Sequence, residues 1–224
     1  MKKAFTLMEL IFVLIVIGIL AVLIIPKTKT NPLQEAAIQL ASHLRYTQHL
    51  AMIDDKYTTS DDKWYKMRWI LVFSSSKYTG GSDVWAYTIF SDTAGNHTGD
   101  AQQSEIAKNP LNQEQLMTGG YGKEKAINFT DDGFKGMKEL NIGTKYGIIG
   151  DNGVKLKGGC RYSRIGFDYL GRPMYGSHKD SVKPYDDYHQ QLIKTDCKII
   201  LTDQENNSVT LIIKPETGYI SINF

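Results

Sequence analysis

An apolar run occupies the N-terminal part of this chain, from Phe5 to Ile25, and only Thr6 and Glu9 interrupt it with polar side chains. As an α-helix at about 1.5 Å per residue, the run would measure roughly 31 Å. This length matches the hydrocarbon core of a bilayer, which is about 30 Å thick. The run therefore predicts a helix that spans a membrane.

Lys2 and Lys3 precede the run, and basic residues before a first spanning helix keep that end in the cytoplasm. We therefore expect the rest of the chain to be exported. Three interpretations of the run compete at this point. The first is a cleaved secretory signal, but such a signal needs small residues where this chain has "LIIPKTKT". The second is an ordinary uncleaved anchor, which does not explain Glu9. The third is that Glu9 simply extends its carboxylate to the membrane interface.

The stretch "KKAFTLMEL", followed by the apolar run, resembles the leader of type IV prepilins. The resemblance implies that a prepilin peptidase cleaves between Ala4 and Phe5 and that the new N-terminal Phe5 is methylated. Family members usually have Gly where this chain has Ala4. The implied partners are other pilins or pseudopilins, contacted through the N-terminal helix, and an assembly platform in the inner membrane.

The resemblance also gives Glu9 a role in assembly. Cleavage leaves a positive amine on Phe5, and an unpaired charge is costly in the apolar core of a filament. The Glu9 carboxylate of one subunit would pair with the Phe5 amine of its neighbour and set the axial register. Cleavage also removes Lys2 and Lys3 from a chain of formal charge +2, which leaves it near neutral, so charge gives no argument for nucleic acid as a partner.

The sequence beyond the run predicts one exported α+β domain. We expect a leader at 1–4, a transmembrane helix at 5–25, a continuation of that helix at 26–55 and a periplasmic β-rich region at 56–224. The simplest form is one long N-terminal helix, with a possible break at Asn31 and Pro32, packed on an antiparallel sheet. The stripe that would cover the sheet consists of Leu33, Ala36, Ala37, Ile38, Leu40, Ala41, Leu44 and Ala51.

Short β-branched or aromatic runs, separated by turn residues, predict the strands. They are "WILVF", "VWAYTIF", "AINF", "YGIIG", "RIGF", "CKIILT", "VTLIIK" and "YISINF". The connections between the last three are short, and "PETG" supplies Pro and Gly at turn positions, so we expect an antiparallel meander.

Several of these segments resemble the GspH/FimT-type minor pseudopilins: "LRYTQHLAMIDDKY", "VWAYTIFSDTAGN", "RIGFDYLGRP" and "TLIIKPETGYISI". The resemblance implies a non-enzymatic subunit at or near the tip of a type II secretion or type IV pilus filament. The alternative is a FimT-like minor pilin that binds DNA in transformation, or a surface adhesin. The C-terminal tail lacks the arginines of that branch, so DNA contact would have to use "KLKGGCRYSR", with Lys155, Lys157, Arg161 and Arg164.

Cys160 and Cys197 are the only cysteines. Because an exported domain lies in a compartment that permits disulfides, we expect them to pair. The alternative is two buried free thiols.

The sequence contains no catalytic or cofactor-binding signature, so we predict no enzymatic activity, no cofactor and no metal site. A membrane-tethered enzyme is therefore the weakest of three functional hypotheses, after the filament subunit and the DNA-binding pilin or adhesin. Two loops hold groups that could bind a metal. His178 and His189 could act together with Asp186 and Asp187. Asp92, Asn96 and Asp100 could hold calcium, although a turn built by Gly and Asn explains that loop equally well.

Overall fold

A computed structural model describes residues 6–24, 31–122, 127–176, 178–186 and 191–224. The chain divides into two compact units, Met1–Asn31 and Pro32–Phe224. The first unit contains helix α1, Leu7–Ile24. Among the described residues, no helix combines the length and the apolar character that a bilayer crossing requires. The spanning segment at 5–25 therefore remains a prediction.

Helix α2 (Pro32–Ile53) opens the second unit. The single long helix expected from the sequence is not confirmed, because α1 ends at Ile24, residues 25–30 lie outside the described residues and α2 begins at Pro32. Proline disfavours helical conformation at the residue before it and lacks an N–H for the helix interior, so Pro32 suits a first helical position.

One stripe of α2 is buried, much as its periodicity predicts. It consists of Leu33, Ala36, Ala37, Leu40, Ala41, Leu44, Thr47 and Ala51. The inclusion of Ile38 in this stripe was wrong, since its side chain is 56% exposed. Two residues before Leu40, at about 100° per residue, Ile38 points to the opposite side of the helix.

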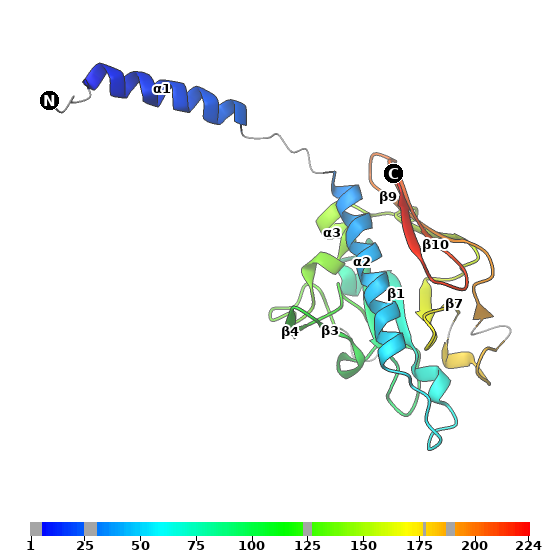
Figure 1. The fold of residues 1–224 in the computed structure, drawn as a ribbon. Coiled ribbons are helices and arrows are strands. Elements are labelled where there is room, and N and C mark those ends of the chain that lie inside the picture. Colours follow the sequence, from blue (N-terminus) through cyan, green and yellow to red (C-terminus); the bar gives the residue numbers. More distant parts are fainter. Residues whose placement is uncertain (1–5, 25–30, 123–126, 177, 187–190) are drawn as a thin grey trace. The chain divides into compact units, whose positions relative to one another are not determined.

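The strands of the second unit form antiparallel sheets, so the α+β class is confirmed. Figure 1 shows α2 beside the strands, and it contacts both of the larger sheets. The five-stranded sheet has the order β2 (Gly81–Ser91), β1 (Trp69–Ser76), β6 (Arg164–Phe167), β7 (Pro173–Tyr175) and β8 (Gln191–Leu192). The four-stranded sheet has the order β11 (Ile220–Asn223), β10 (Ser208–Ile213), β9 (Cys197–Thr202) and β5 (Val154–Gly158).

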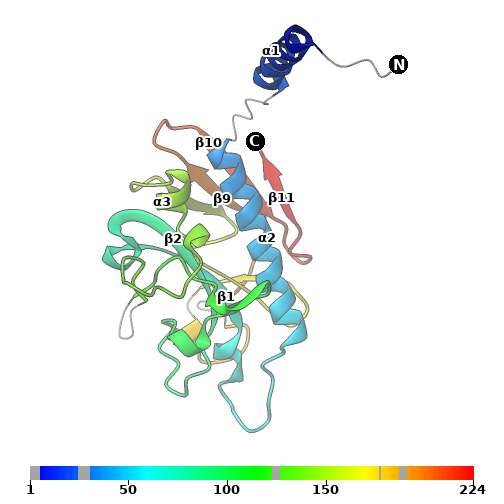
Figure 2. The same cartoon turned by 90° about the vertical axis from the view of Figure 1, so that its left-hand side faces the viewer.

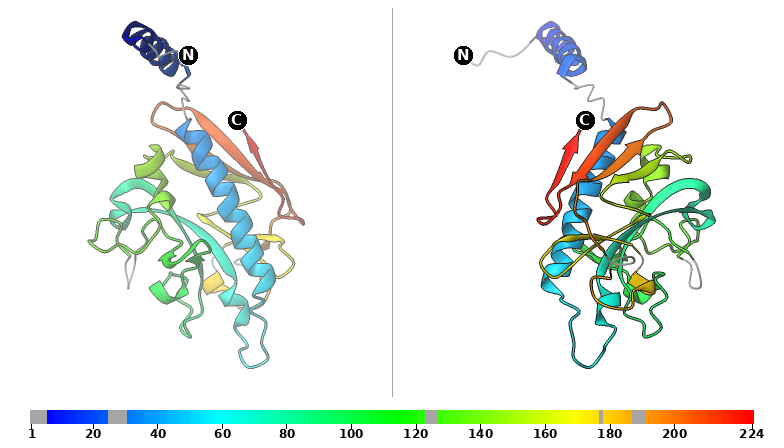
Figure 3. Two further views of the ribbon diagram at one scale, coloured as in Figure 1. Left: turned by 60° about the vertical axis from the view of Figure 1, so that its left-hand side comes forward. Right: turned by 90° about the vertical axis from the view of Figure 1, so that its right-hand side faces the viewer.

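A long excursion connects β2 to β5. It contains the small hairpin β3 (Lys108–Asn109) and β4 (Asn112–Leu116), and the short helix α3 (Ile142–Tyr146). Figure 1 shows the hairpin on one side of α2 and strands β9 and β10 on the other. In Figure 2, β9 and β10 lie to one side of α2 and β11 to the other, and the two views of Figure 3 show α2 in front of the strands and behind them. Single-turn 3₁₀ helices complete the unit: η1 (Trp64–Met67), η2 (Lys77–Thr79), η3 (Gln103–Glu105), η4 (Lys138–Leu140) and η5 (His178–Asp180).

The predicted meander is confirmed, with β9, β10 and β11 paired in sequence order. Two predicted strands are wrong. "YGIIG" begins with Tyr146, the last residue of α3, and continues through Gly147, whose φ of 73° caps that helix in the left-handed region. In "AINF", residue 126 lies outside the described residues, and Ile127 makes only an isolated bridge to Tyr121.

A polar seam joins α2 to the interior of the second unit. The Tyr87 hydroxyl in β2 lies 2.7 Å from His43 Nδ1 and accepts a hydrogen bond of 2.8 Å from Gln39 Nε2. Gln39 Nε2 also donates to the Glu139 carbonyl, and Gln39 Oε1 accepts from the Tyr146 hydroxyl. Each of these contacts pairs a polar group that burial would otherwise leave costly.

Candidate functional site

The predicted cleavage site, Ala4 and Phe5, lies outside the described residues. Glu9 occupies the first turn of α1. Its backbone N–H donates to Thr6 Oγ1 (3.3 Å) and to the Thr6 carbonyl (3.1 Å), so Thr6 caps the helix. The spacing Thr-x-x-Glu is also the signature of a capping box. A capping box would give the Glu9 carboxylate a local role, which the spacing alone could have indicated.

The Cys160–Cys197 disulfide is present, with a Cα–Cα distance of 4.9 Å, so this prediction is confirmed. It joins the turn after β5 to the first residue of β9. Gly158, at the end of β5, pairs with Cys197 in the strand register. A side chain at Gly158 would meet the Asp196 carbonyl at 2.3 Å, and its φ of 76° also favours glycine. The local backbone thus brings the two sulfurs together.

The four basic residues that were predicted as DNA contacts do not form one surface. Lys155 and Lys157 are exposed on β5 and point to the face away from its buried Val154. The Arg161 guanidinium lies 5.8 Å from the centre of the Tyr175 ring. Arg164 belongs to the other sheet, where it donates to the Gly99 carbonyl (2.5 Å) and lies 3.6 Å from Asp100 Oδ1.

The structure adds a lysine that the sequence analysis did not select. Lys198 in β9 pairs directly with Lys157 in β5 and is exposed, like Lys157. Like charges in such a cross-strand pair are destabilising. The antiparallel register, which the sequence alone did not provide, places Lys155, Lys157 and Lys198 on one face.

The loop that could have held calcium is organised by contacts within the protein. Asp92 Oδ2 accepts a hydrogen bond of 2.6 Å from the Gly99 N–H. Asp100 Oδ1 accepts from the Tyr121 hydroxyl (3.1 Å) and faces Arg164. Within the described ranges, no group of three or more His, Cys, Asp or Glu side chains is arranged to hold a metal ion. Burial raises the pKa of Asp92 to about 6, although the Gly99 hydrogen bond opposes this shift.

His178 is buried in η5, and Asp186 is the one other member of the second predicted metal site that belongs to the described residues. Burial lowers the pKa of His178 to about 3, and the positive charges of Arg68 and Arg164 act in the same direction. The Asp186 carboxylate accepts a hydrogen bond from the Val182 N–H (3.2 Å). Asp187 and His189 lie outside the described residues.

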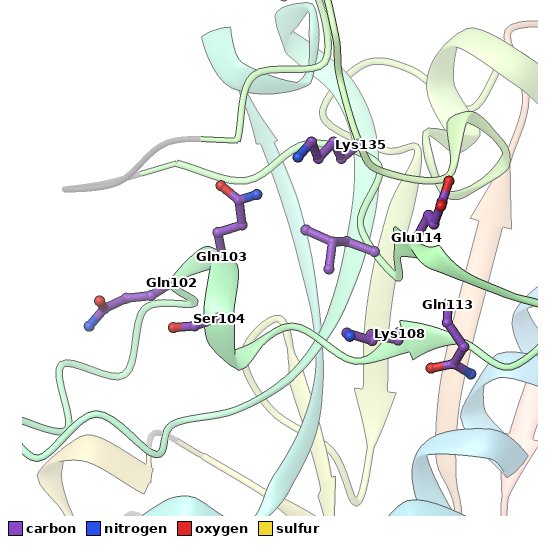
Figure 4. A pocket seen from close by; sticks show the side chains of 8 residues that line it. Gln102, Gln103, Ser104, Lys108, Gln113, Glu114 and Lys135 are labelled. Atoms are coloured by element: carbon purple, nitrogen blue, oxygen red, sulfur yellow. The ribbon is translucent and has the colours of Figure 1, made fainter.

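A hollow of about 520 Å³ lies beside the β3–β4 hairpin, and we call it the β4 groove. Figure 4 shows Lys135 above it and Lys108 below it, with Gln103 on the left and Glu114 on the right. Gln102, Ser104, Gln113 and Leu116 complete its lining. Nothing in the sequence pattern indicated this hollow, because its walls come from four separate segments between residues 102 and 135.

Comparisons with protein-family models, with curated proteins and with solved structures found no match to this chain.

Proposed function

We propose that this chain is a minor pilin or pseudopilin subunit of a type IV pilus or type II secretion filament. One observation carries the proposal: the leader-like "KKAFTLMEL" leads directly into the apolar helix α1. In this proposal a prepilin peptidase cuts between Ala4 and Phe5 and Phe5 is methylated. The N-terminal helix then anchors the subunit in the inner membrane and packs against neighbouring pilins on the assembly platform.

The element order of the second unit supports the proposal. An amphipathic helix comes first and packs on antiparallel sheet, as expected for the head of such a subunit. The disulfide fits an oxidising compartment, which agrees with a periplasmic position for this unit. The role is structural, in assembly at or near the filament tip, and no enzymatic step is assigned to the chain.

Intact-mass measurement of the protein extracted from membranes of its native host tests the proposal. We expect loss of Met1 to Ala4 and the addition of one methyl group. Replacing Ala4 with a charged residue, as in Ala4→Asp, should leave the leader in place, because the peptidase requires a small residue there. An unprocessed N-terminus in the parent protein would contradict the proposal.

A DNA-binding minor pilin is the second candidate, and the shared face of Lys155, Lys157 and Lys198 is the observation that favours it. Three phosphate contacts would make the logarithm of the binding constant fall with the logarithm of salt concentration, with a slope of about −3. Titration of labelled duplex DNA at several salt concentrations measures this slope. A Lys157→Gln variant should reduce the magnitude of this slope by about one.

A further inference from the structure

Two lysines line the β4 groove. Lys108 and Lys135 are both exposed, and neither forms an ion pair with a carboxylate in the part of the chain that the structure describes. The backbones of both residues, by contrast, are fixed. The Lys108 carbonyl accepts from the Tyr46 hydroxyl of α2 (3.1 Å), and the Lys135 carbonyl accepts from the Leu116 N–H (2.9 Å).

The wall that carries Gln103, beside these lysines, is also held in place. Glu105 is 5% exposed, and its carboxylate accepts hydrogen bonds from the Ala94 N–H (2.6 Å) and the Gln102 N–H (2.8 Å). These bonds fix the turn that presents Gln103 to the hollow. A rigid wall lowers the entropic cost of ordering a ligand, so the groove is prepared for binding before a ligand arrives.

A second hollow of about 290 Å³ continues the groove and carries the opposite charge. The two hollows share Gln103, Leu116 and Lys135 as lining residues. Beyond Lys135, the second hollow is lined by the exposed carboxylates Asp131 and Asp132. Two lysines and one carboxylate, Glu114, line the first hollow, whereas two carboxylates and one lysine, Lys135, line the second. The net charge of the lining therefore changes along the groove from positive to negative.

The chemistry of the lining selects the class of ligand. The amides of Gln103 and Gln102 offer both donors and acceptors, which match the N–H and C=O groups of an extended backbone. The first hollow has no aromatic ring on which a sugar or a base could stack, and Leu116 is its sole apolar side chain. The one aromatic ring that lines the second hollow, Phe134, already packs in an edge-to-face contact with Phe129. We propose that the β4 groove binds an extended polypeptide segment of a partner protein, with a carboxylate at Lys108 and Lys135 and a basic side chain at Asp131 and Asp132.

Fluorescence anisotropy of the full chain in detergent tests this assignment. The probes are labelled peptides of glycine, blocked at both ends, in which one glutamate and one lysine are separated by one to four glycines. At the best spacing, the double variant Lys108→Glu, Lys135→Glu should weaken binding about tenfold. A matched double variant of the same charge change on β5, Lys155→Glu with Lys157→Glu, should leave the affinity unchanged.

A compensating probe makes the test specific for charge. A peptide with lysine at both charged positions should bind the Lys108→Glu, Lys135→Glu variant more tightly than it binds the parent protein. The proposal is overturned if no peptide binds at any spacing, if glutamine at both charged positions leaves binding unchanged, or if the β5 variant weakens binding equally. Binding of an acidic oligosaccharide in place of the peptides would also overturn it.

Discussion

His43 Nδ1 of helix α2 lies 2.7 Å from the Tyr87 hydroxyl of strand β2. The Tyr87 side chain is fully buried, and burial lowers the pKa of His43 to about 4, although the nearby Glu139 charge opposes this shift. The imidazole is therefore neutral near pH 7 and exchanges one hydrogen bond with the hydroxyl. This pair ties the helix to the sheet, and its Tyr87 side is closed to water because that side chain is fully buried.

Tyr87→Phe should destabilise the protein by about 1 to 3 kcal/mol, because it leaves His43 and one contact of Gln39 without a partner. The tryptophans at 64, 69 and 85 all belong to the second unit, so urea unfolding of the full chain can be followed by their fluorescence. Tyr219→Phe is the matched control, since Tyr219 is 63% exposed and should cost less than about 0.5 kcal/mol. Equal effects of the two variants would show that the seam is not stabilising.

The Cys160–Cys197 disulfide should contribute about 4 kcal/mol, because it closes a loop with a sequence separation of 37 and restricts the unfolded chain. Replacing both cysteines with alanine, which fits their buried positions, removes the link without leaving a free thiol. The measurement is the free energy of urea unfolding of this double variant against the parent. A loss below about 1 kcal/mol would mean that strain in the folded state cancels the entropic gain.

Asp92 should make stability depend on pH. Its folded pKa of about 6 exceeds the ordinary value of 3.8, so the folded state binds more protons between these values. The contribution of Asp92 to stability is therefore fully present below pH 3.8 and is lost as the pH rises through 6. Asparagine has a shape similar to that of aspartate and carries no charge. As the pH rises from 4 to 7, the free energy of unfolding of Asp92→Asn should therefore increase by about 2 to 3 kcal/mol relative to that of the parent.

The pH dependence must be read as a difference between variant and parent, because His178 acts in the opposite direction. With a folded pKa of about 3, His178 lowers stability as the pH falls below its ordinary value of 6.5. Asp151→Asn, at an exposed position, serves as the control and should leave the profile unchanged. A pH-independent difference between Asp92→Asn and the parent would contradict the assigned burial of this carboxylate.

Local patterns were sufficient for some elements and insufficient for others. The stripe from Leu33 to Ala51 has helical period and the meander from Cys197 alternates, so both were predictable. The strands β3, β4, β5, β7 and β8 were missed. The segments "KN", "NQEQL" and "VKLKG" are largely polar, "PMY" and "QL" are very short, and all of them become strands only through pairing with neighbours. The pairing of Lys157 with Lys198 and the β4 groove follow from tertiary contacts, which no local pattern encodes.

The two explanations of Glu9 make different predictions. If its charge pairs with the Phe5 amine of a neighbouring subunit, Glu9→Gln should reduce assembly as strongly as Glu9→Ala, since both remove the charge. If Glu9 serves the capping box, Glu9→Gln should assemble normally, because glutamine also suits the third helical position. Thr6→Ala removes the observed cap and retains the charge, at a cost of about 1 kcal/mol to the helix.

Crosslinking of each variant to its partner pilins in membranes of the native host separates the two roles. We expect the two Glu9 variants to lose incorporation into the filament and Thr6→Ala to retain it, because the proposed register depends on the carboxylate and not on the cap. Unfolding of the second unit, followed by tryptophan fluorescence, should be the same in all three variants, since Glu9 and Thr6 belong to the first unit. Normal crosslinking of Glu9→Gln would assign Glu9 to the helix terminus and leave the axial register to other contacts.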